Sequence, residues 1–140
     1  MLDMDCIFCK IIAGEATAYK VYENEFTLVI LDINPISAGH VIIMPKNHFE
    51  KLSDMDEING LELFKTVLIM EKMIASLGCA CTNLLQNNGK AAGQEIPHVH
   101  VHIIPRYPQD FFRLKYRKAV VTPDMQNYVL KKYKEYLNLP

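Results

Sequence analysis

Short apolar stretches recur along the chain and are separated by polar or turn-forming residues. They are rich in β-branched and aromatic side chains, which favour strands. The pattern predicts five strands, over residues 19–23, 26–32, 40–44, 81–87 and 98–104. Only the short break Asn24-Glu25 separates the first two stretches, so they are expected to form a hairpin.

Two shorter segments carry helical signals. Residues 7–13 predict a short helix that ends at Gly14, because glycine readily adopts the left-handed conformation that closes a helix. Near the other end of the chain, Thr122 is expected to cap a basic helix whose first residue is Pro123.

One long helix is expected in the middle of the chain. Ser53 and Asp56 resemble a capping box at its start, and Gly78 is a stop signal after about Leu77. Apolar residues at helical spacing form a broad stripe that is interpreted as facing the core: Ile58, Leu61, Phe64, Leu68, and Met73 or Ile74.

Together these elements predict the α+β class, with a mainly antiparallel five-stranded sheet, one long helix, a short N-terminal helix and a C-terminal helix. The 140 residues are enough for one domain that buries a core. We expect a single domain over 1–140, in which 107–140 form a C-terminal extension that includes the last helix.

Composition narrows the functional classes. The net charge of −1 gives no basic excess of the kind that nucleic-acid binders carry. The first residues lack the positive and apolar regions of a signal peptide. The longest apolar run, 66–70, is far too short to span a bilayer. A cytoplasmic protein with no membrane segment is therefore expected, and nucleic acid is not expected as its partner.

Three histidines alternate with apolar residues in the last predicted strand, at His98, His100 and His102. On a strand, alternate side chains project from one face about 6.6 Å apart. Neighbouring imidazoles can bind a metal ion, or supply a nucleophile together with partners that hold phosphate oxygens. The alternative is a polar face on an edge strand, which the spacing and the preceding glycine-containing loop disfavour.

Four cysteines suggest metal ligands or buried thiols in a reducing compartment. Cys6 and Cys9 have the spacing of a zinc-binding pair, although two thiolates make only half a tetrahedral site. A redox pair or two metal-free buried thiols are the alternatives. Cys79 and Cys81 are interpreted as inert small apolar residues, and a four-cysteine site that joins both pairs is the weakest reading of them.

Several segments resemble the histidine triad family in sequence order. Beside the alternating histidines, they are Cys6-Ile-Phe-Cys9-Lys-Ile-Ile, Asp32-Ile-Asn-Pro35, Gly39-His40, Pro45-Lys46-Asn47-His48, and Asn87 through Gln94. The resemblance covers most of the chain. It is strongest to the bacterial-type, zinc-carrying branch of nucleoside phosphoramidases and nucleotide hydrolases.

The resemblance implies a reaction. The middle histidine, His100, would attack the α-phosphorus and form a covalent nucleotidyl-histidine that water then hydrolyses. A neutral imidazole is abundant at pH 7, which suits this role. His102 and His40 would contact the phosphate or the leaving group. Because the uridylyltransferase branch typically has glutamine at the third position, His102 favours hydrolysis over transfer.

The resemblance also assigns binding roles. Asn87 and the backbone near Gly93 and Gln94 would hold phosphate oxygens, and Asp32 would bind the ribose hydroxyls. Walls of the base pocket would be Phe8, Ile11, Ile30 and Ile33. Ordinary turn or core roles are the alternatives for all of these. Glu95 departs from members that carry serine there, which leaves proton donation to the leaving group at this position in doubt.

Cys6, Cys9, His48 and His98 are the ligands that the resemblance implies for one structural zinc. Family members also pair through the long helix and an adjacent strand, so a homodimer is expected. The implied function is a nucleotidyl hydrolase that acts on purine nucleoside phosphoramidates. The alternatives are a dinucleoside polyphosphate hydrolase, a nucleotide-binding module with little catalysis, and a zinc-stabilised structural domain.

The C-terminal extension begins with aromatic and basic residues that alternate over 111–118. Such a segment can form a platform for single-stranded nucleic acid. Packing of the aromatic residues onto the domain or onto a dimer partner is the favoured interpretation.

Overall fold

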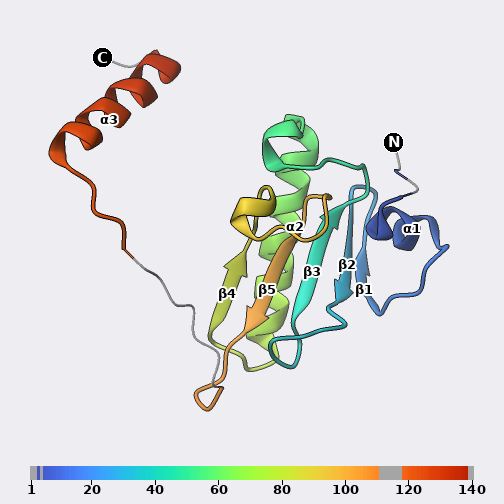
Figure 1. Cartoon of the computed structure of the whole chain (residues 1–140). Coiled ribbons are helices and arrows are strands. Elements are labelled where there is room, and N and C mark those ends of the chain that lie inside the picture. Colours follow the sequence, from blue (N-terminus) through green and yellow to red (C-terminus); the bar gives the residue numbers. More distant parts are fainter. Residues whose placement is uncertain (1–2, 4, 111–117, 139–140) are drawn as a thin grey trace.

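Within residues 3, 5–110 and 118–138, which the structure describes, the computed structural model contains five strands, three α-helices and two short 3-10 helices. In chain order they are α1 (Ile7–Ala13), β1 (Lys20–Glu23), β2 (Thr27–Leu31), β3 (Val41–Pro45), η1 (Leu52–Asp54), α2 (Glu57–Ser76), β4 (Thr82–Leu85), η2 (Lys90–Ala92), β5 (Val101–Pro105) and α3 (Pro123–Leu137). The strands form one antiparallel sheet in the order β1-β2-β3-β5-β4 (Figure 1). The predicted α+β class is confirmed.

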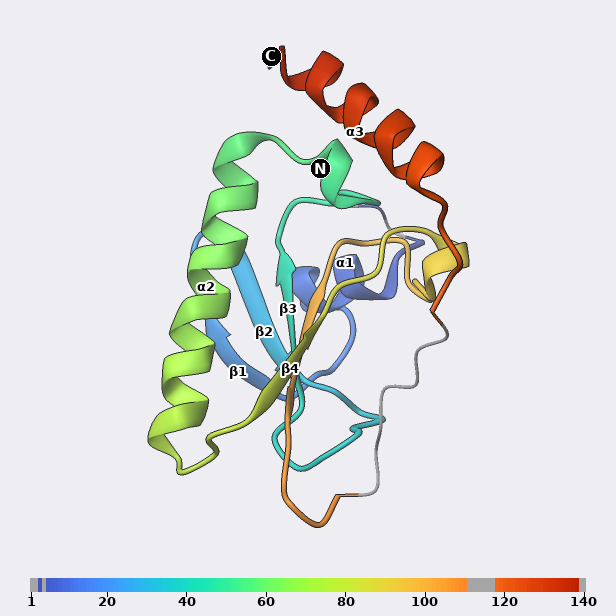
Figure 2. The same cartoon turned by 90° about the vertical axis from the view of Figure 1, so that its left-hand side faces the viewer.

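Alternate residues of the central strands pack on opposite faces of the sheet, as the two-residue period of a strand requires. On one face Val29, Ile43 and Val101 join a core cluster with α2. On the other face Leu28 and Ile42 join a second cluster with α1. Figure 2 shows α2 and α1 on the two sides of the sheet. Because both faces are covered, the strands are almost continuously apolar in sequence.

Helix α2 turns a different side to the sheet than the sequence predicted. Its buried apolar residues are Leu63, Val67, Met70 and Ile74. The other residues of the predicted core stripe are 37–64 % exposed: Ile58, Leu61, Phe64, Leu68 and Met73. That prediction was wrong because the helix is apolar on most of its sides, so the periodicity does not identify the side that faces the sheet.

The start of α2 also differs from the prediction. Asp56 is its N-cap, and the Asp56 carboxylate accepts a hydrogen bond from the backbone N–H of Asn59 at 2.9 Å. Ser53 lies within the separate helix η1. A capping box spanning Ser53 and Asp56 is therefore not the start of α2, since a carboxylate at Asp56 provides the cap directly.

Helix α3 begins as predicted, with Thr122 accepting a hydrogen bond from the N–H of Met125 at 3.3 Å. None of its residues is buried, and Figure 1 shows it standing apart from the sheet. The segment 111–117, which carries most of the predicted aromatic and basic platform, lies outside the described residues. No helix within the described part of the chain combines the length and apolar character that crossing a bilayer requires.

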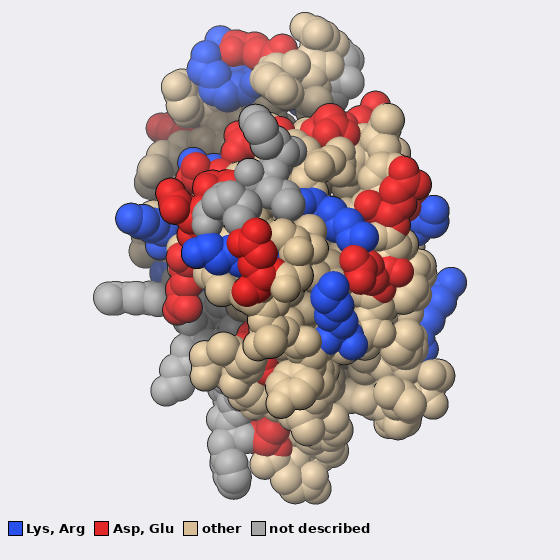
Figure 3. Space-filling view, turned by 90° about the vertical axis from the view of Figure 1, so that its right-hand side faces the viewer, with Lys and Arg blue, Asp and Glu red and all other residues tan. Residues whose placement is uncertain are grey.

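The surface in Figure 3 carries both signs of charge. Acidic and basic side chains lie interspersed among uncharged ones on this face. Among the described residues seen there, no broad patch of positive charge gathers of the kind that binds a nucleic-acid backbone.

Candidate active site and metal centre

A cleft of about 540 Å³ opens on the face of the sheet opposite α2. This volume is within the range of small-molecule sites. His40, His100, His102 and Asp32 provide most of its ionisable side chains. They come from different segments, since His102 lies in β5, His100 immediately before it, and Asp32 and His40 flank the loop between β2 and β3.

His100 is held by the backbone of its own segment. Its Nδ1 lies 2.6 Å from the carbonyl oxygen of His98. Because a carbonyl oxygen only accepts, Nδ1 must carry the proton, which leaves a lone pair on Nε2. Burial lowers the pKa of His100, although the His98 carbonyl and the charges of Asp32 and Glu95 oppose the effect. His100 is therefore a neutral imidazole with an unprotonated Nε2.

His40 and His102 form a hydrogen-bonded pair in which each ring carries its proton on Nε2, whereas His100 carries its proton on Nδ1. The backbone N–H of Ile36 donates to His40 Nδ1 at 3.0 Å, so the proton of neutral His40 is on Nε2. That Nε2 lies 2.9 Å from His102 Nδ1 and donates to it. Neutral His102 consequently carries its proton on Nε2. Its ring centroid is 5.0 Å from that of His100, so the ring with a donor at Nε2 lies next to the ring with a lone pair at Nε2.

The electrostatics of the pair keep it neutral. Burial lowers the pKa of His102 to about 4, reinforced by His100 and His40 and opposed by Asp32. Burial also lowers the pKa of His40, with Asp32 again opposing. One Asp32 oxygen lies 3.4 Å from His40 Nε2 and 3.6 Å from His102 Nδ1. The carboxylate would stabilise a proton that arrives on either ring during a reaction.

The loop before β5 is braced by amide side chains. Asn87 Nδ2 donates to the carbonyl of Gly93 at 3.2 Å, and both residues line the cleft. Gly93 has a φ of +86°, which favours glycine. Gln94 is buried; its Oε1 accepts from the N–H of Gly89, and its Nε2 donates to the carbonyls of Glu50 and Ile96. Its side chain therefore holds the loop and does not line the cleft.

The apolar residues expected around a base all line the cleft: Phe8, Ile11, Ile30 and Ile33. Phe8 approaches His100 edge to face, with ring centroids 5.2 Å apart. Ile33 is largely exposed, so its contribution to the cleft wall is at the rim.

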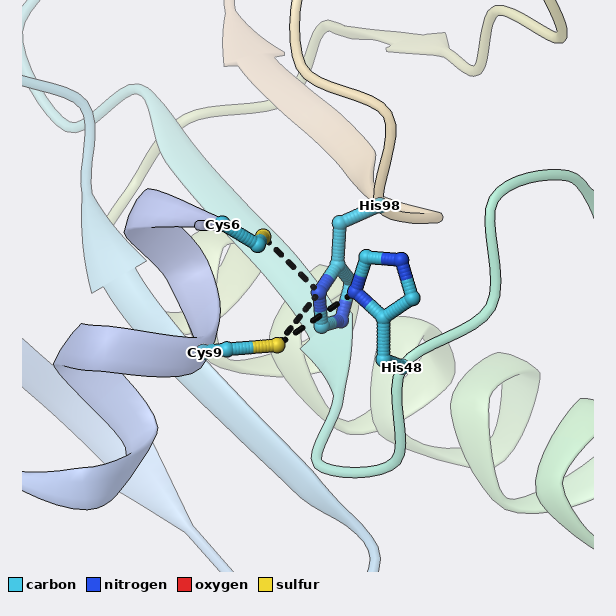
Figure 4. A group of neighbouring side chains, drawn as sticks. All are labelled: Cys6, Cys9, His48 and His98. Carbon is cyan, nitrogen blue, oxygen red and sulfur yellow. Dashed lines mark hydrogen bonds between the residues drawn. The ribbon is translucent and has the colours of Figure 1, made fainter. Parts of the chain in front are cut away.

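A second group of side chains gathers beside the cleft. Cys6 and Cys9 of the first helical segment meet His48 and His98, and their ligand atoms all lie within 4.8 Å of one another (Figure 4). His98 Nδ1 is 3.5 Å from Cys6 Sγ and 3.6 Å from Cys9 Sγ, and His48 Nδ1 is 3.3 Å from Cys9 Sγ. Tetrahedral zinc with usual bond lengths separates sulfur and nitrogen ligands by about 3.6 Å. The four residues therefore fit a zinc ion.

The second ring nitrogen of His98 is held by a backbone carbonyl. His98 Nε2 donates to the carbonyl of Pro45 at 2.9 Å, so the lone pair of neutral His98 is on Nδ1, facing the thiols. Burial lowers the pKa of His98 to about 4. Cys79 and Cys81 lie outside the group. A single site formed by all four cysteines is therefore wrong.

The three alternating histidines thus divide between two sites. The predicted strand over 98–104 was partly wrong, because β5 begins at Val101 and both His98 and His100 precede it. His98 turns to the cysteines, whereas His100 and His102 line the cleft. A regular strand would have spaced all three equally, and the backbone before β5 is not constrained in that way.

Comparison with known proteins identifies the family of this chain. The model of the HIT domain family matches residues 13–109, which include His40, His100 and His102. The chain belongs to the HIT family. The match starts after Cys6 and Cys9, so the family model does not extend to the two thiols.

HIT relatives of this chain occur in distant organisms. A HIT-like protein of Methanocaldococcus jannaschii is 47 % identical over 75 % of this chain and 81 % of its own length. An adenosine 5'-monophosphoramidase of Saccharomyces cerevisiae is 42 % identical, and the match covers 75 % of this chain and 65 % of that relative. An adenylylsulfatase of Arabidopsis thaliana is 46 % identical, and the match covers 78 % of this chain and 56 % of that relative. This chain therefore spans just over half of the adenylylsulfatase.

Solved structures of other proteins share the fold. A protein from Leishmania major superposes with a TM-score of 0.86 at 34 % identity, covering 96 % of both chains. A histidine triad nucleotide-binding protein from Candida albicans gives 0.84 at 33 % identity, covering 95 % of this chain and 97 % of its own. The family match and the relatives named as an adenylylsulfatase and an adenosine 5'-monophosphoramidase support a hydrolase. The chain is a hydrolase of the histidine triad type.

Some cleft residues of this HIT protein were not expected from the sequence. Leu85 lines the cleft because β4 pairs with β5 so that Leu85 lies opposite His102. Ile36 and Ile96 also line it. The position of Leu85 in the cleft follows only from the strand register. In the sequence it is one apolar residue among many, and nothing there indicates that it lines the cleft. Glu95, which stands where some family members carry serine, lies in the cleft wall as well.

Proposed function

We propose that this protein hydrolyses purine nucleoside phosphoramidates through a covalent nucleotidyl intermediate on His100. The observation that carries the proposal is the pair of opposite tautomers in the cleft. His100 presents a lone pair, and His102, with its ring centroid 5.0 Å away, presents an N–H. A nucleophile and a proton donor are the two groups that cleavage of a phosphorus–nitrogen bond requires.

In the first step His100 Nε2 attacks the α-phosphorus, and a bond forms between them while the phosphorus–nitrogen bond breaks. The leaving amine takes the electron pair of that bond and the Nε2 proton of His102. The ring stays neutral because the His40–His102 pair beside Asp32 takes up one proton from solvent in exchange. In the second step water attacks the phosphorus, and the bond between phosphorus and His100 Nε2 breaks with its electron pair returning to the ring. The water gives one proton to His102, the His40–His102 pair releases one proton to solvent, and the nucleoside monophosphate leaves. Asp32, close to both rings of the His40–His102 pair, stabilises the charge that changes during these transfers.

Phosphate oxygens are proposed to bind at the loop before β5. One amide hydrogen of Asn87 is used by the Gly93 carbonyl, and the second remains for a ligand. The ribose is proposed to lie against Asp32, and the base between the apolar walls formed by Phe8, Ile11 and Ile30. These side chains bind the nucleoside without taking part in bond breaking.

Zinc is proposed to have a structural role at Cys6, Cys9, His48 and His98. The set supplies four protein ligands, so a tetrahedral ion there keeps no open position for a substrate. Such an ion would fasten α1, which contributes Phe8 and Ile11 to the cleft, to the segment that precedes β5. The unpaired thiols also suit a reducing compartment, and we propose a cytoplasmic location.

A homodimer is part of the same proposal. The outward side of α2 exposes Ile58, Leu61, Phe64 and Leu68 in one row, which is unusual for a surface facing water. A second copy that packs against this row would bury it. Light scattering is expected to give twice the chain mass of 16.1 kDa, and a Leu61→Glu change is expected to give the chain mass itself.

The decisive experiment traps the intermediate. The protein is mixed with adenosine phosphoramidate labelled in the adenylate, quenched within the first turnover, and digested for peptide mapping. The expected result is adenylate on His100, stable to base and labile to acid. His100→Asn, which keeps a similar size and polarity, should trap no label. Turnover of that variant at the wild-type rate would refute the proposed mechanism.

A further inference from the structure

The charges around the cleft have one sign. Among the described residues that line it, Asp32 and Glu95 carry carboxylates, and neither lysine nor arginine is present. The His40–His102 pair adds no positive charge, because burial lowers the pKa of His102 to about 4 and lowers that of His40. A substrate that contains a phosphate therefore meets a wall whose fixed charges are negative.

The two carboxylates differ in how they are held. Asp32 accepts a hydrogen bond from the N–H of Asn34 at 2.8 Å and faces His40 and His102. Glu95 is exposed, and it makes no hydrogen bond or ion pair with any other residue in the described ranges. It nevertheless lines the same cleft as His100. Glu95 is thus available to a ligand in the cleft.

The strand register places the two carboxylates at opposite ends of the site. Asp32 follows Leu31, which pairs with Val41, and Val41 pairs with Ile103. Glu95 belongs to the loop that enters β5 from its other end. Figure 1 shows that loop at the end of the sheet opposite the connection between β2 and β3. A nucleotide with its ribose at Asp32 and its phosphorus at His100 extends its leaving group toward Glu95.

From this geometry we infer that Glu95 forms a subsite for leaving amines that carry a second, protonated amino group. The inference rests on the proposed function, in which a phosphorus–nitrogen bond is broken. It narrows the substrate class to nucleoside phosphoramidates of diamines or similar cationic amines. Leaving groups that carry negative charge, such as carboxylates, sulfate or polyphosphate, are disfavoured at the same place.

The subsite does not alter the chemistry of bond breaking. The bond between His100 Nε2 and phosphorus forms, the phosphorus–nitrogen bond breaks, and the amine receives its proton from His102. Glu95 stays ionised throughout and pairs with the distant ammonium of the leaving group. At separations of about 5–7 Å in a partly hydrated site, one such charge pair changes a rate by about tenfold, and the change falls with added salt.

The test uses three adenosine phosphoramidates with the same phosphorus–nitrogen bond. Their amines are 3-aminopropylamine, propylamine and β-alanine, whose far ends are positive, neutral and negative. The expected kcat/KM falls by about tenfold at each step in that order. Glu95→Gln should bring the ratio of the first to the last close to one, and Glu95→Lys should invert the order. Glu25→Gln, an exposed carboxylate outside the cleft, should keep the wild-type ratio.

The outcomes separate the two proposals. One outcome would overturn the subsite alone. In it the propylamine compound turns over through labelled His100, but Glu95→Gln leaves the kcat/KM ratios of the three compounds unchanged. Failure of all three compounds to label or turn over would overturn the proposed function and the subsite with it. A ratio that collapses in Glu95→Gln and inverts in Glu95→Lys, and that shrinks with added potassium chloride, supports the subsite.

Discussion

The cleft and the metal centre are built from the same kind of residue and use it in opposite ways. His98 and His100 are both buried, two residues apart, and each has one ring nitrogen bonded to a backbone carbonyl. In His98 the carbonyl of Pro45 engages Nε2, so Nδ1 faces the thiols. In His100 the carbonyl of His98 engages Nδ1, so Nε2 faces the cleft.

The contrast shows that the residue type alone does not decide whether a buried histidine faces the candidate metal group or the cleft. Burial keeps both rings neutral, and a backbone carbonyl selects the nitrogen that remains free. The two groups are also joined, because His98, whose ring lies in the candidate metal group, accepts a hydrogen bond at its carbonyl from His100, the proposed nucleophile. Disturbing the metal group is therefore expected to affect the proposed nucleophile, whereas replacing the His100 ring is not expected to affect the metal group.

The largest effect is expected from His100. Changing His100 to Asn should lower kcat by about 10⁴-fold or more, because no other ring in the cleft presents a free Nε2 lone pair. Nucleotide binding, measured by calorimetry with AMP, should stay within a few-fold of the wild type. The zinc content should not change, since the ring of His100 lies outside the metal group. Loss of zinc in this variant would contradict the separation of the two sites.

The metal centre is expected to act on both stability and activity. Changing Cys9 to Ser should release zinc and lower the free energy of unfolding by about 4 kcal/mol or more. Because the His98 carbonyl then loses its fixed position, kcat should also fall by about 10²-fold.

Cys81→Ser is the matched control for Cys9→Ser, because this thiol is exposed and lies outside the metal group. It should leave zinc, stability and kcat unchanged. Full activity of a zinc-free Cys9→Ser protein would show that the metal centre and the nucleophile are independent.

Much of the fold was predictable because its signals are local. Apolar stretches gave the strands, Gly14 and Thr122 marked helix ends, and the Cys6–Cys9 spacing indicated half a metal site. The side of α2 that faces the sheet was not predictable. Its apolar residues surround the helix, and only the sheet's position decides which of them are buried.

In the site, the residues were easier to predict than their chemical states. The spacing predicted a group of three histidines, and the family resemblance singled out His100 and His102. Their proton positions depend on the carbonyl of His98 and the N–H of Ile36. A backbone group has the same form at every residue, so the sequence carries no sign of it. The same holds for Leu85, which reaches the cleft through strand pairing.

A smaller effect is expected from pH, because His102 is held neutral. Its pKa is lowered from 6.5 to about 4 on folding, so the unfolded chain binds the proton more tightly between these values. Stability should therefore fall as the pH drops below about 6.5 and level off below about 4. Between pH 7 and pH 5 the contribution of His102 to the free energy of unfolding should decrease by about 2 kcal/mol.

Urea unfolding of the zinc-loaded protein and of His102→Gln at both pH values isolates this contribution. The variant should lose about 2 kcal/mol less than the wild type over that interval. Equal losses in the two proteins would mean that His102 titrates alike in the folded and unfolded chain, and that the donor in the cleft is not a neutral imidazole.

The smallest effect is expected from Phe8, which touches both sites. Its ring meets His98 and His100 edge to face, with centroid separations of 5.8 Å and 5.2 Å. Phe8→Leu keeps an apolar side chain but removes both aromatic contacts, at a cost of about 1 kcal/mol in stability. The metal should remain, because four ligands hold it without help from the ring. The His100 ring lacks such an anchor, so kcat/KM should fall a few-fold. Zinc analysis, urea unfolding and steady-state kinetics test these three outcomes, with Phe26→Leu in the turn between β1 and β2 as the control. Loss of zinc with unchanged kcat/KM would reverse the comparison, since it would show the metal group to be the less firmly held of the two sites.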